Sequence, residues 1–137
     1  MLPPIVSELS SEPKVTERLD KIKAVCEQVC EEEISLEEFS NFCVQLSEEL
    51  AVKANEILET VESTGYAKDA PQEVEAGFKG IDLYEQGLTK MILFIGEGNP
   101  DYLDEALEML SQGNDYINEA MSLNRQARRN LDWEIWA

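Results

Sequence analysis

Histidine is absent from the 137 residues of this chain. It is the side chain that most often moves protons near neutral pH, and it completes the Glu-x-x-His metal sites of ferritin-like helical proteins. Its absence excludes those metal sites and the Ser-His-Asp triads of hydrolases. The acidic run at 31–33 offers no replacement, since adjacent helical residues point in different directions. We therefore predict that the chain is not an enzyme and that it holds no cofactor or metal.

Basic residues are scarce, with 11 Lys and Arg against 29 Asp and Glu, which gives a formal net charge of -18. A surface of this charge repels nucleic acids and anionic lipid. We expect neither of these as partners. We expect instead a protein with a basic or amphipathic segment, or self-association. A weaker alternative is that the acidic helices mimic nucleic acid toward a basic protein, with strongly salt-sensitive binding.

Long apolar runs are missing as well. The longest one, Met91–Ile95, is far shorter than the roughly 20 residues that span a bilayer. No basic residue precedes Lys14, so we find no sign of a secretory signal. We expect a cytoplasmic protein with reduced thiols.

The chain has three cysteines, Cys26, Cys30 and Cys43. Together with a carboxylate they could hold zinc. However, the Cys-x-x-x-Cys spacing within a helix is not usual for structural zinc, and cysteine often serves as a small buried side chain. We favour core packing over a metal site.

Apolar residues make up 43% of the chain, and they recur at alternating spacings of three and four. This spacing predicts amphipathic helices packed along one another. The predicted fold is an all-α, single-domain, antiparallel up-down-up-down four-helix bundle, with a short extended N-terminal arm. The arm covers residues 1–12, and the bundle at 13–137 has helices over roughly 13–32, 36–63, 70–95 and 100–131.

Local signals support these boundaries. Ser35 and Glu38 form a capping box, which predicts a helix start. Gly65 suits the end of that helix, because glycine accepts the left-handed conformation found there. Asp69 is expected to cap the third helix and Asn99 the fourth.

The last two predicted helices carry complementary apolar lines joined by a short turn. One line runs Gly77, Gly80, Tyr84, Gly87, Met91 and Phe94, and the other runs Leu103, Ala106, Leu110, Gly113, Ile117, Ala120, Asn124, Ala127 and Leu131. An antiparallel hairpin about residues 98–99 brings large side chains opposite small ones. The expected pairs are Met91–Ala106, Leu110–Gly87, Tyr84–Gly113, Ile117–Gly80 and Gly77–Ala120.

The end of the sequence combines its only basic cluster with both of its tryptophans. Trp and Arg often dominate the energetics of interfaces, so these residues are candidates for docking a partner: Arg125, Arg128, Arg129, Trp133 and Trp136. The alternative, which we favour slightly, is that this tail folds back and its rings cover the end of the bundle.

These features favour a non-enzymatic, acidic helical protein-interaction module, such as an adaptor, a chaperone-like protein or a regulatory protein. The alternative function is a helical bundle that binds a small molecule, with an apolar pocket where glycines line the contact between the third and fourth helices.

Overall fold

A computed structural model describes residues 13–127 and 133–137 of the chain, with side-chain surroundings for 17–126 and 135–137. The part so described consists of helices joined by short turns and contains no strand, so the all-α prediction is confirmed. The predicted arm at 1–12 lies outside the described residues. The elements are α2 (Pro13–Cys30), α3 (Leu36–Thr64), α4 (Tyr66–Asp69), α5 (Pro71–Glu97), α6 (Asp101–Ala127) and the 3₁₀ helix η1 (Trp133–Trp136).

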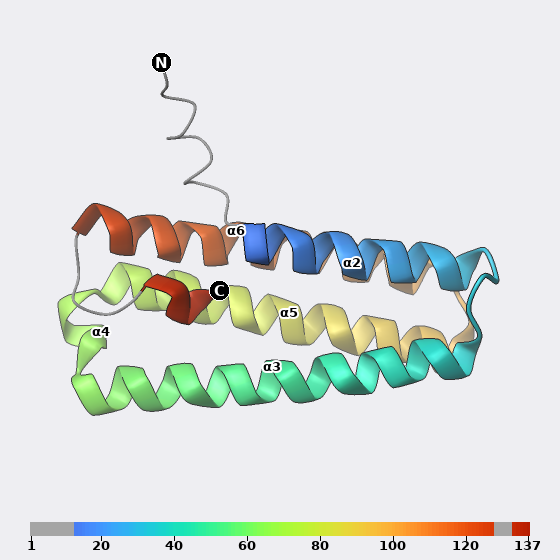
Figure 1. Ribbon diagram of the computed structural model, residues 1–137, viewed down its shortest axis with the longest axis horizontal. Coiled ribbons are helices and arrows are strands. Elements are labelled where there is room, and N and C mark those ends of the chain that lie inside the picture. Colours follow the sequence, from blue (N-terminus) through green and yellow to red (C-terminus); the bar gives the residue numbers. More distant parts are fainter. Residues whose placement is uncertain (1–12, 128–132) are drawn as a thin grey trace, which may run out of the picture.

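The four long helices lie along the long axis of the molecule, as Figure 1 shows. The most extensive helix contact joins α5 to α6, while α3 packs on α5 and α2 packs on α6. The C-terminal η1 turns back and lies against α6. One core runs between the helices, and the rings of Phe39 and Phe94 meet there edge to face at 5.8 Å. These contacts bury the α5 line from Gly77 to Phe94 and the α6 line from Leu103 to Asn124; Ala127 and Leu131 of the predicted line lie outside the residues whose side chains are described.

The contact between α5 and α6 depends on glycine. A Cβ atom added to Gly80 would lie 2.7 Å from Cγ1 of Ile117, and one added to Gly87 would lie 2.8 Å from Cγ of Leu110. Both predicted pairings are therefore confirmed. The predicted pairing of Gly113 with Tyr84 is found as well, because a Cβ atom added to Gly113 would lie 2.8 Å from Cδ1 of Tyr84. Successive residues of α5 therefore contact residues of decreasing number on α6. The two backbones approach closely because glycine has no Cβ to separate them.

Most predicted helix ends are found where expected. Ser35 and Glu38 form the complete capping box. The backbone N–H of Glu38 donates to Oγ of Ser35 at 3.0 Å, and the backbone N–H of Ser35 donates to Oε1 of Glu38 at 2.9 Å. Gly65 ends α3 with a φ of 68°. The side chain of Asn99 accepts a hydrogen bond from the backbone N–H of Asp101 at 3.0 Å. These signals are local, so the sequence carries them directly.

The predicted cap at Asp69 is wrong, and the end of α2 lies two residues before the predicted one. Asp69 does not cap α5; it is the last residue of α4, and Ala70 occupies the cap position without a side-chain bond. The chain makes an extra helical turn there because Tyr66 is drawn into the core. Helix α2 ends at Cys30 rather than at residue 32. It ends in a Schellman-type turn, with Glu32 at a φ of 60° in the position usually held by glycine.

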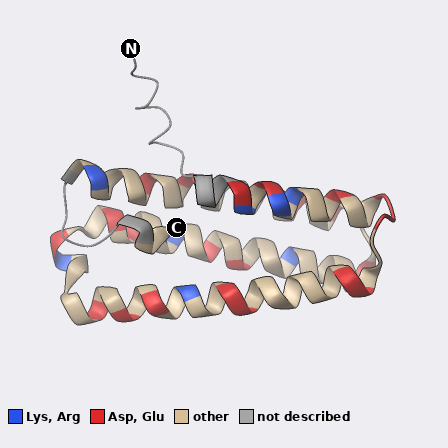
Figure 2. Cartoon of the chain, in the orientation of Figure 1, with Lys and Arg blue, Asp and Glu red and all other residues tan. Residues whose placement is uncertain are grey.

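The other boundaries shift by one or two residues, and the predicted extension of α6 to 131 enters residues that the structure does not describe. Acidic side chains occur on all four long helices, as Figure 2 shows. Across the described part of the chain, none of the helices combines the length and the apolar character needed to cross a membrane.

Candidate functional site

Trp136, a predicted docking residue, is buried with only 2% of its surface exposed. Its indole lies directly on Gly77, whose missing side chain leaves room for the ring. The ring also meets Phe78 edge to face at 6.0 Å. The atoms nearest to Gly77 thus belong to Trp136 and not to Ala120, the predicted neighbour. The tail folds back at this residue, and Trp136 is not available as an exposed anchor.

Trp136 is held by a buried carboxylate on α5. Glu73 is 2% exposed and accepts hydrogen bonds from Nε1 of Trp136 at 2.8 Å, from the hydroxyl of Tyr66 at 2.6 Å and from Nδ2 of Asn124 at 3.0 Å. A buried carboxylate is costly unless several donors surround it. We call these four residues the tail clasp, because they join η1 to α4, α5 and α6.

The other predicted docking residues are placed only in part. Arg125 is half-buried near the end of α6. Arg128 and Arg129 lie outside the described residues. Trp133 begins η1, but its side chain also lies outside the described part. Of the five residues, the structure therefore places Trp136 in the core and Arg125 at the end of α6. It does not show the five residues forming one surface.

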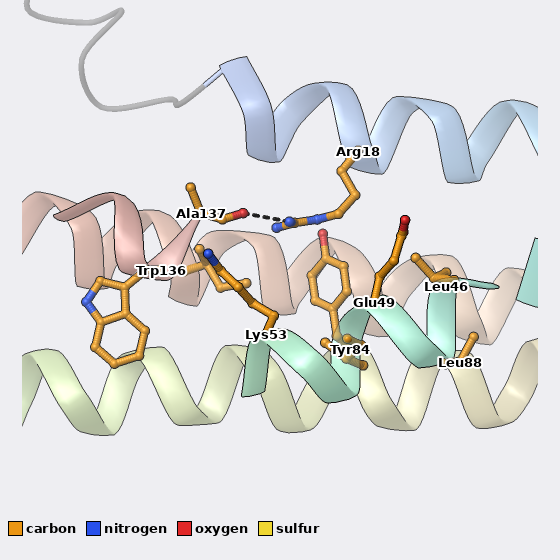
Figure 3. A pocket seen from close by; sticks show the side chains of 10 residues that line it. Arg18, Leu46, Glu49, Lys53, Tyr84, Leu88, Trp136 and Ala137 are labelled. Atoms are coloured by element: carbon orange, nitrogen blue, oxygen red, sulfur yellow. Dashed lines mark hydrogen bonds between the residues drawn. The ribbon is translucent and has the colours of Figure 1, made fainter. Parts of the chain in front are cut away.

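At the glycine-lined contact of α5 and α6, where the alternative function expects a pocket, Ile117 lies on Gly80 and Leu110 lies on Gly87. A cavity of about 230 Å³ lies instead between α2, α3, α5, α6 and the C-terminal residues, as Figure 3 shows. Its apolar walls come from Leu46, Leu50, Tyr84, Leu88, Ile117 and Trp136. The cavity could not be predicted from helical periodicity, because its walls depend on where the tail returns.

Arg18 of α2 lines this cavity. Its Nη1 donates a hydrogen bond of 2.7 Å to the backbone oxygen of Ala137, and its guanidinium carbon lies 5.2 Å from the ring centroid of Tyr84. Its Nε–H is buried and has no hydrogen-bond partner among the described residues. Burial raises the pKa of Tyr84 and the nearby Arg18 cation opposes that rise, so Tyr84 keeps its proton at neutral pH. Lys53 and Glu49, both on α3, also line the cavity.

Helix α3 carries most of the exposed large apolar side chains. They are Leu36, Val44, Val52 and Leu58 on α3, and Ile92 and Leu93 on α5. Val44 and Leu58 are 55% and 43% exposed, and Ala51, which is also exposed, stands midway between them. These three residues are seven apart, so they form one line along the helix. We call this line the α3 face.

Two of the three cysteines belong to the core. Cys26 and Cys43 are buried, whereas Cys30 is exposed. Burial is the main reason that the pKa of Cys26 rises to about 12 and that of Cys43 to about 11, so both thiols stay protonated at neutral pH. In the described part of the chain, no three His, Cys, Asp or Glu side chains are grouped so as to hold a metal ion. Core packing accounts for Cys26 and Cys43.

No protein-family model, no curated protein and no solved structure matches the chain. The function must therefore be argued from the tail clasp, the cavity and the α3 face.

Proposed function

We propose that the chain is a non-enzymatic protein-interaction module, an adaptor, chaperone-like or regulatory protein, and that the α3 face docks its partner. The observation that carries this proposal is the line of Val44, Ala51 and Leu58, three uncharged residues at heptad spacing that no other described element of the chain covers. A second helix packs along such a line with its own apolar residues.

Charge selects the partner in this proposal. Glu48, Glu59 and Glu62 are exposed on α3 and follow one side of the α3 face. The chain as a whole carries a net charge of -18. A partner helix with lysines or arginines beside its apolar stripe matches both features, and the negative field speeds its approach. The same charge disfavours a second copy of the chain, which would bring like charges together.

We also propose the arrangement that presents this face. The four long helices form an antiparallel up-down-up-down bundle in one domain, a reading that the opposed numbering of the α5–α6 contacts supports. In such a bundle each long helix keeps an outer face free for docking. The cytoplasm, where many adaptors act, is the location that we propose.

The test uses a synthetic amphipathic helix of leucine and lysine in heptads, with a scrambled peptide of the same composition as reference. We expect the amphipathic peptide to bind more tightly than the scrambled one. The double variant Val44→Gln/Leu58→Gln should weaken its binding about tenfold or more, because it removes apolar contact and leaves the charge unchanged. Fluorescence anisotropy of the labelled peptide measures both effects.

Ile92→Gln is the matched control, since Ile92 is 49% exposed but belongs to α5. We expect it to leave the peptide affinity within about twofold, and circular dichroism should show both variants fully helical. Equal binding of the two peptides, or equal loss in both variants, would mean that charge alone drives the association, and the proposal would fail. Sedimentation of the unmodified chain tests self-association: a dimer that Val44→Gln/Leu58→Gln dissociates would make a second copy the occupant of the α3 face.

A further inference from the structure

The cavity beside Arg18 combines apolar walls with a guanidinium whose Nε–H has no hydrogen-bond partner among the described residues, in a protein of net charge -18. We propose that it binds a small amphipathic anion, a carboxylate with an apolar tail. This inference does not depend on the α3 face or on a protein partner.

The head group of the ligand is assigned by Arg18. One corner of its guanidinium is occupied, because Nη1 donates to the backbone oxygen of Ala137 at 2.7 Å. The Nε–H is buried without a partner in the described structure, and leaving a buried donor unpaired is unfavourable. A carboxylate accepts hydrogen bonds side-on from Nε and the adjacent Nη2, which is a strong charge-assisted geometry. Among the described lining residues, Lys53 adds a second positive side chain and Glu49 a negative one.

The tail of the ligand is assigned by the walls and the volume. Leu46, Leu50, Leu88 and Ile117 offer no hydrogen-bonding side chain, so an apolar group displaces little bound water from them. A dry cavity of about 150 Å³ is known to take benzene. In the same proportion, 230 Å³ holds roughly nine non-hydrogen atoms. Octanoate is close to this size, and dodecanoate exceeds it.

The returning tail shapes the site. Trp136 and Ala137 both line the cavity, and each is fixed on its other side, Trp136 by Glu73 and Ala137 by Arg18. The wall is therefore held by the tail clasp, so the site exists before a ligand arrives. A preformed site loses less conformational entropy on binding.

The experiment is isothermal titration calorimetry of the full chain with octanoate, octanol and dodecanoate. We expect octanoate to bind at least about ten times more tightly than octanol, which lacks the charge, and than dodecanoate, which is too long. Arg18→Met should abolish the preference for octanoate over octanol. Lys79→Met, which removes the same charge from α5 outside the cavity lining, should leave the preference unchanged.

Two further variants separate binding from folding. Arg18→Lys keeps the positive charge and removes the side-on pair of donors, so octanoate affinity should fall several-fold while the helix content stays the same. Leu50→Phe fills the cavity and should abolish binding of octanoate and octanol alike. Octanol binding as tightly as octanoate, octanoate affinity that survives Arg18→Lys and Arg18→Met, or no binding of octanoate at all would each overturn the proposal.

Discussion

Glu73 is the residue on which the C-terminal packing depends. Its two carboxylate oxygens accept hydrogen bonds from Tyr66, Asn124 and Trp136. A glutamine there has one oxygen instead of two and turns an N–H₂ group toward donors. We expect Glu73→Gln to lower the free energy of unfolding by about 1–3 kcal/mol, the cost of buried donors left unpaired.

Urea unfolding followed by circular dichroism measures this loss. Glu75→Gln is the matched control, because it makes the same change two residues away at an exposed position. It should stay within about 0.5 kcal/mol of the unmodified chain. Equal effects of the two variants would show that the tail clasp contributes nothing to stability.

Glu32 adopts a left-handed conformation at the end of α2, with a φ of 60°. This conformation costs a side chain with a Cβ atom roughly 1–2 kcal/mol, and glycine avoids most of that cost. We expect Glu32→Gly to raise the free energy of unfolding by about 0.5–1 kcal/mol after the greater entropy of unfolded glycine is subtracted. Thermal unfolding checks the sign. Glu33 does not have a positive φ, so Glu33→Gly should be neutral or destabilising. An increase in the free energy of unfolding equal to that of Glu32→Gly would contradict the explanation.

The buried thiols predict a loss of stability in alkali. The pKa is about 12 for Cys26 and about 11 for Cys43 in the folded chain, compared with about 8.5 in an unfolded one. Above pH 8.5 the unfolded chain releases these protons first, so the free energy of unfolding falls as the pH rises toward 11. We expect Cys26→Ala/Cys43→Ala to show a shallower fall than Cys30→Ala in urea unfolding between pH 8.5 and 10.5.

Thiol labelling at pH 8 gives an independent readout. Cys30 is exposed and should react with iodoacetamide first, although burial and the nearby Asp104 and Glu31 raise its pKa too. Cys26 and Cys43 should react only on the timescale of unfolding, because their thiolate fractions are very small. Labelling of Cys43 as fast as Cys30 in the folded chain would contradict the burial described here.

At the scale of elements, the packing of α5 on α6 predicts opposite effects for two alanine substitutions. Alanine at Gly80 would bring a Cβ within 2.7 Å of Ile117 and 2.8 Å of the backbone oxygen of Gly113. We expect Gly80→Ala to destabilise the chain by about 1 kcal/mol or more, since overpacking outweighs the better helix propensity. Thermal unfolding measures the change.

Gly96 provides the comparison in the same helix, because a Cβ added there meets nothing within 4 Å. Gly96→Ala should be neutral or stabilising by up to about 1 kcal/mol, as helix propensity alone acts. Stabilisation by both substitutions would mean that α5 and α6 can separate without cost.

The helices and the α5–α6 register could be predicted from sequence because both follow local rules. The capping box at Ser35 involves neighbours three residues apart, and the pairing of Gly80 with Ile117 follows once a short turn is recognised. The prediction of helix ends failed where the end depends on a contact with a residue that the local sequence does not indicate. Asp69 has the chemistry of a cap, yet Tyr66 turns inward toward Glu73, and Glu32 ends a helix where no glycine marks the position.

At the scale of the whole molecule, the two proposed sites respond to salt in opposite ways. The net charge of -18 attracts a lysine-rich peptide to the α3 face, and salt screens that attraction. The same charge repels octanoate from a distance, while the contact with Arg18 is short and partly buried. Raising NaCl from 20 to 200 mM should weaken the peptide about tenfold or more and leave octanoate unchanged or tighter. Titrations of both ligands at the two salt concentrations check this.

The candidate sites were harder to predict than the fold. The α3 face could have been found from the spacing of Val44, Ala51 and Leu58, but only the structure shows that these residues are exposed among the described parts of the chain. The cavity is lined by both Arg18 and Trp136, and no periodic pattern relates residues so far apart. The sequence favoured the folded-back tail only slightly over an exposed anchor, because burial of Trp136 depends on the space above Gly77.

The contact between Arg18 and Ala137 joins residues 119 positions apart, and this separation matters during translation. Ribosomes add about 5–20 residues per second, so every helix from α2 to α6 is complete before the indole that covers Gly77 has been made. The wall that Trp136 and Ala137 give to the cavity is therefore synthesised after every helix that forms the other walls.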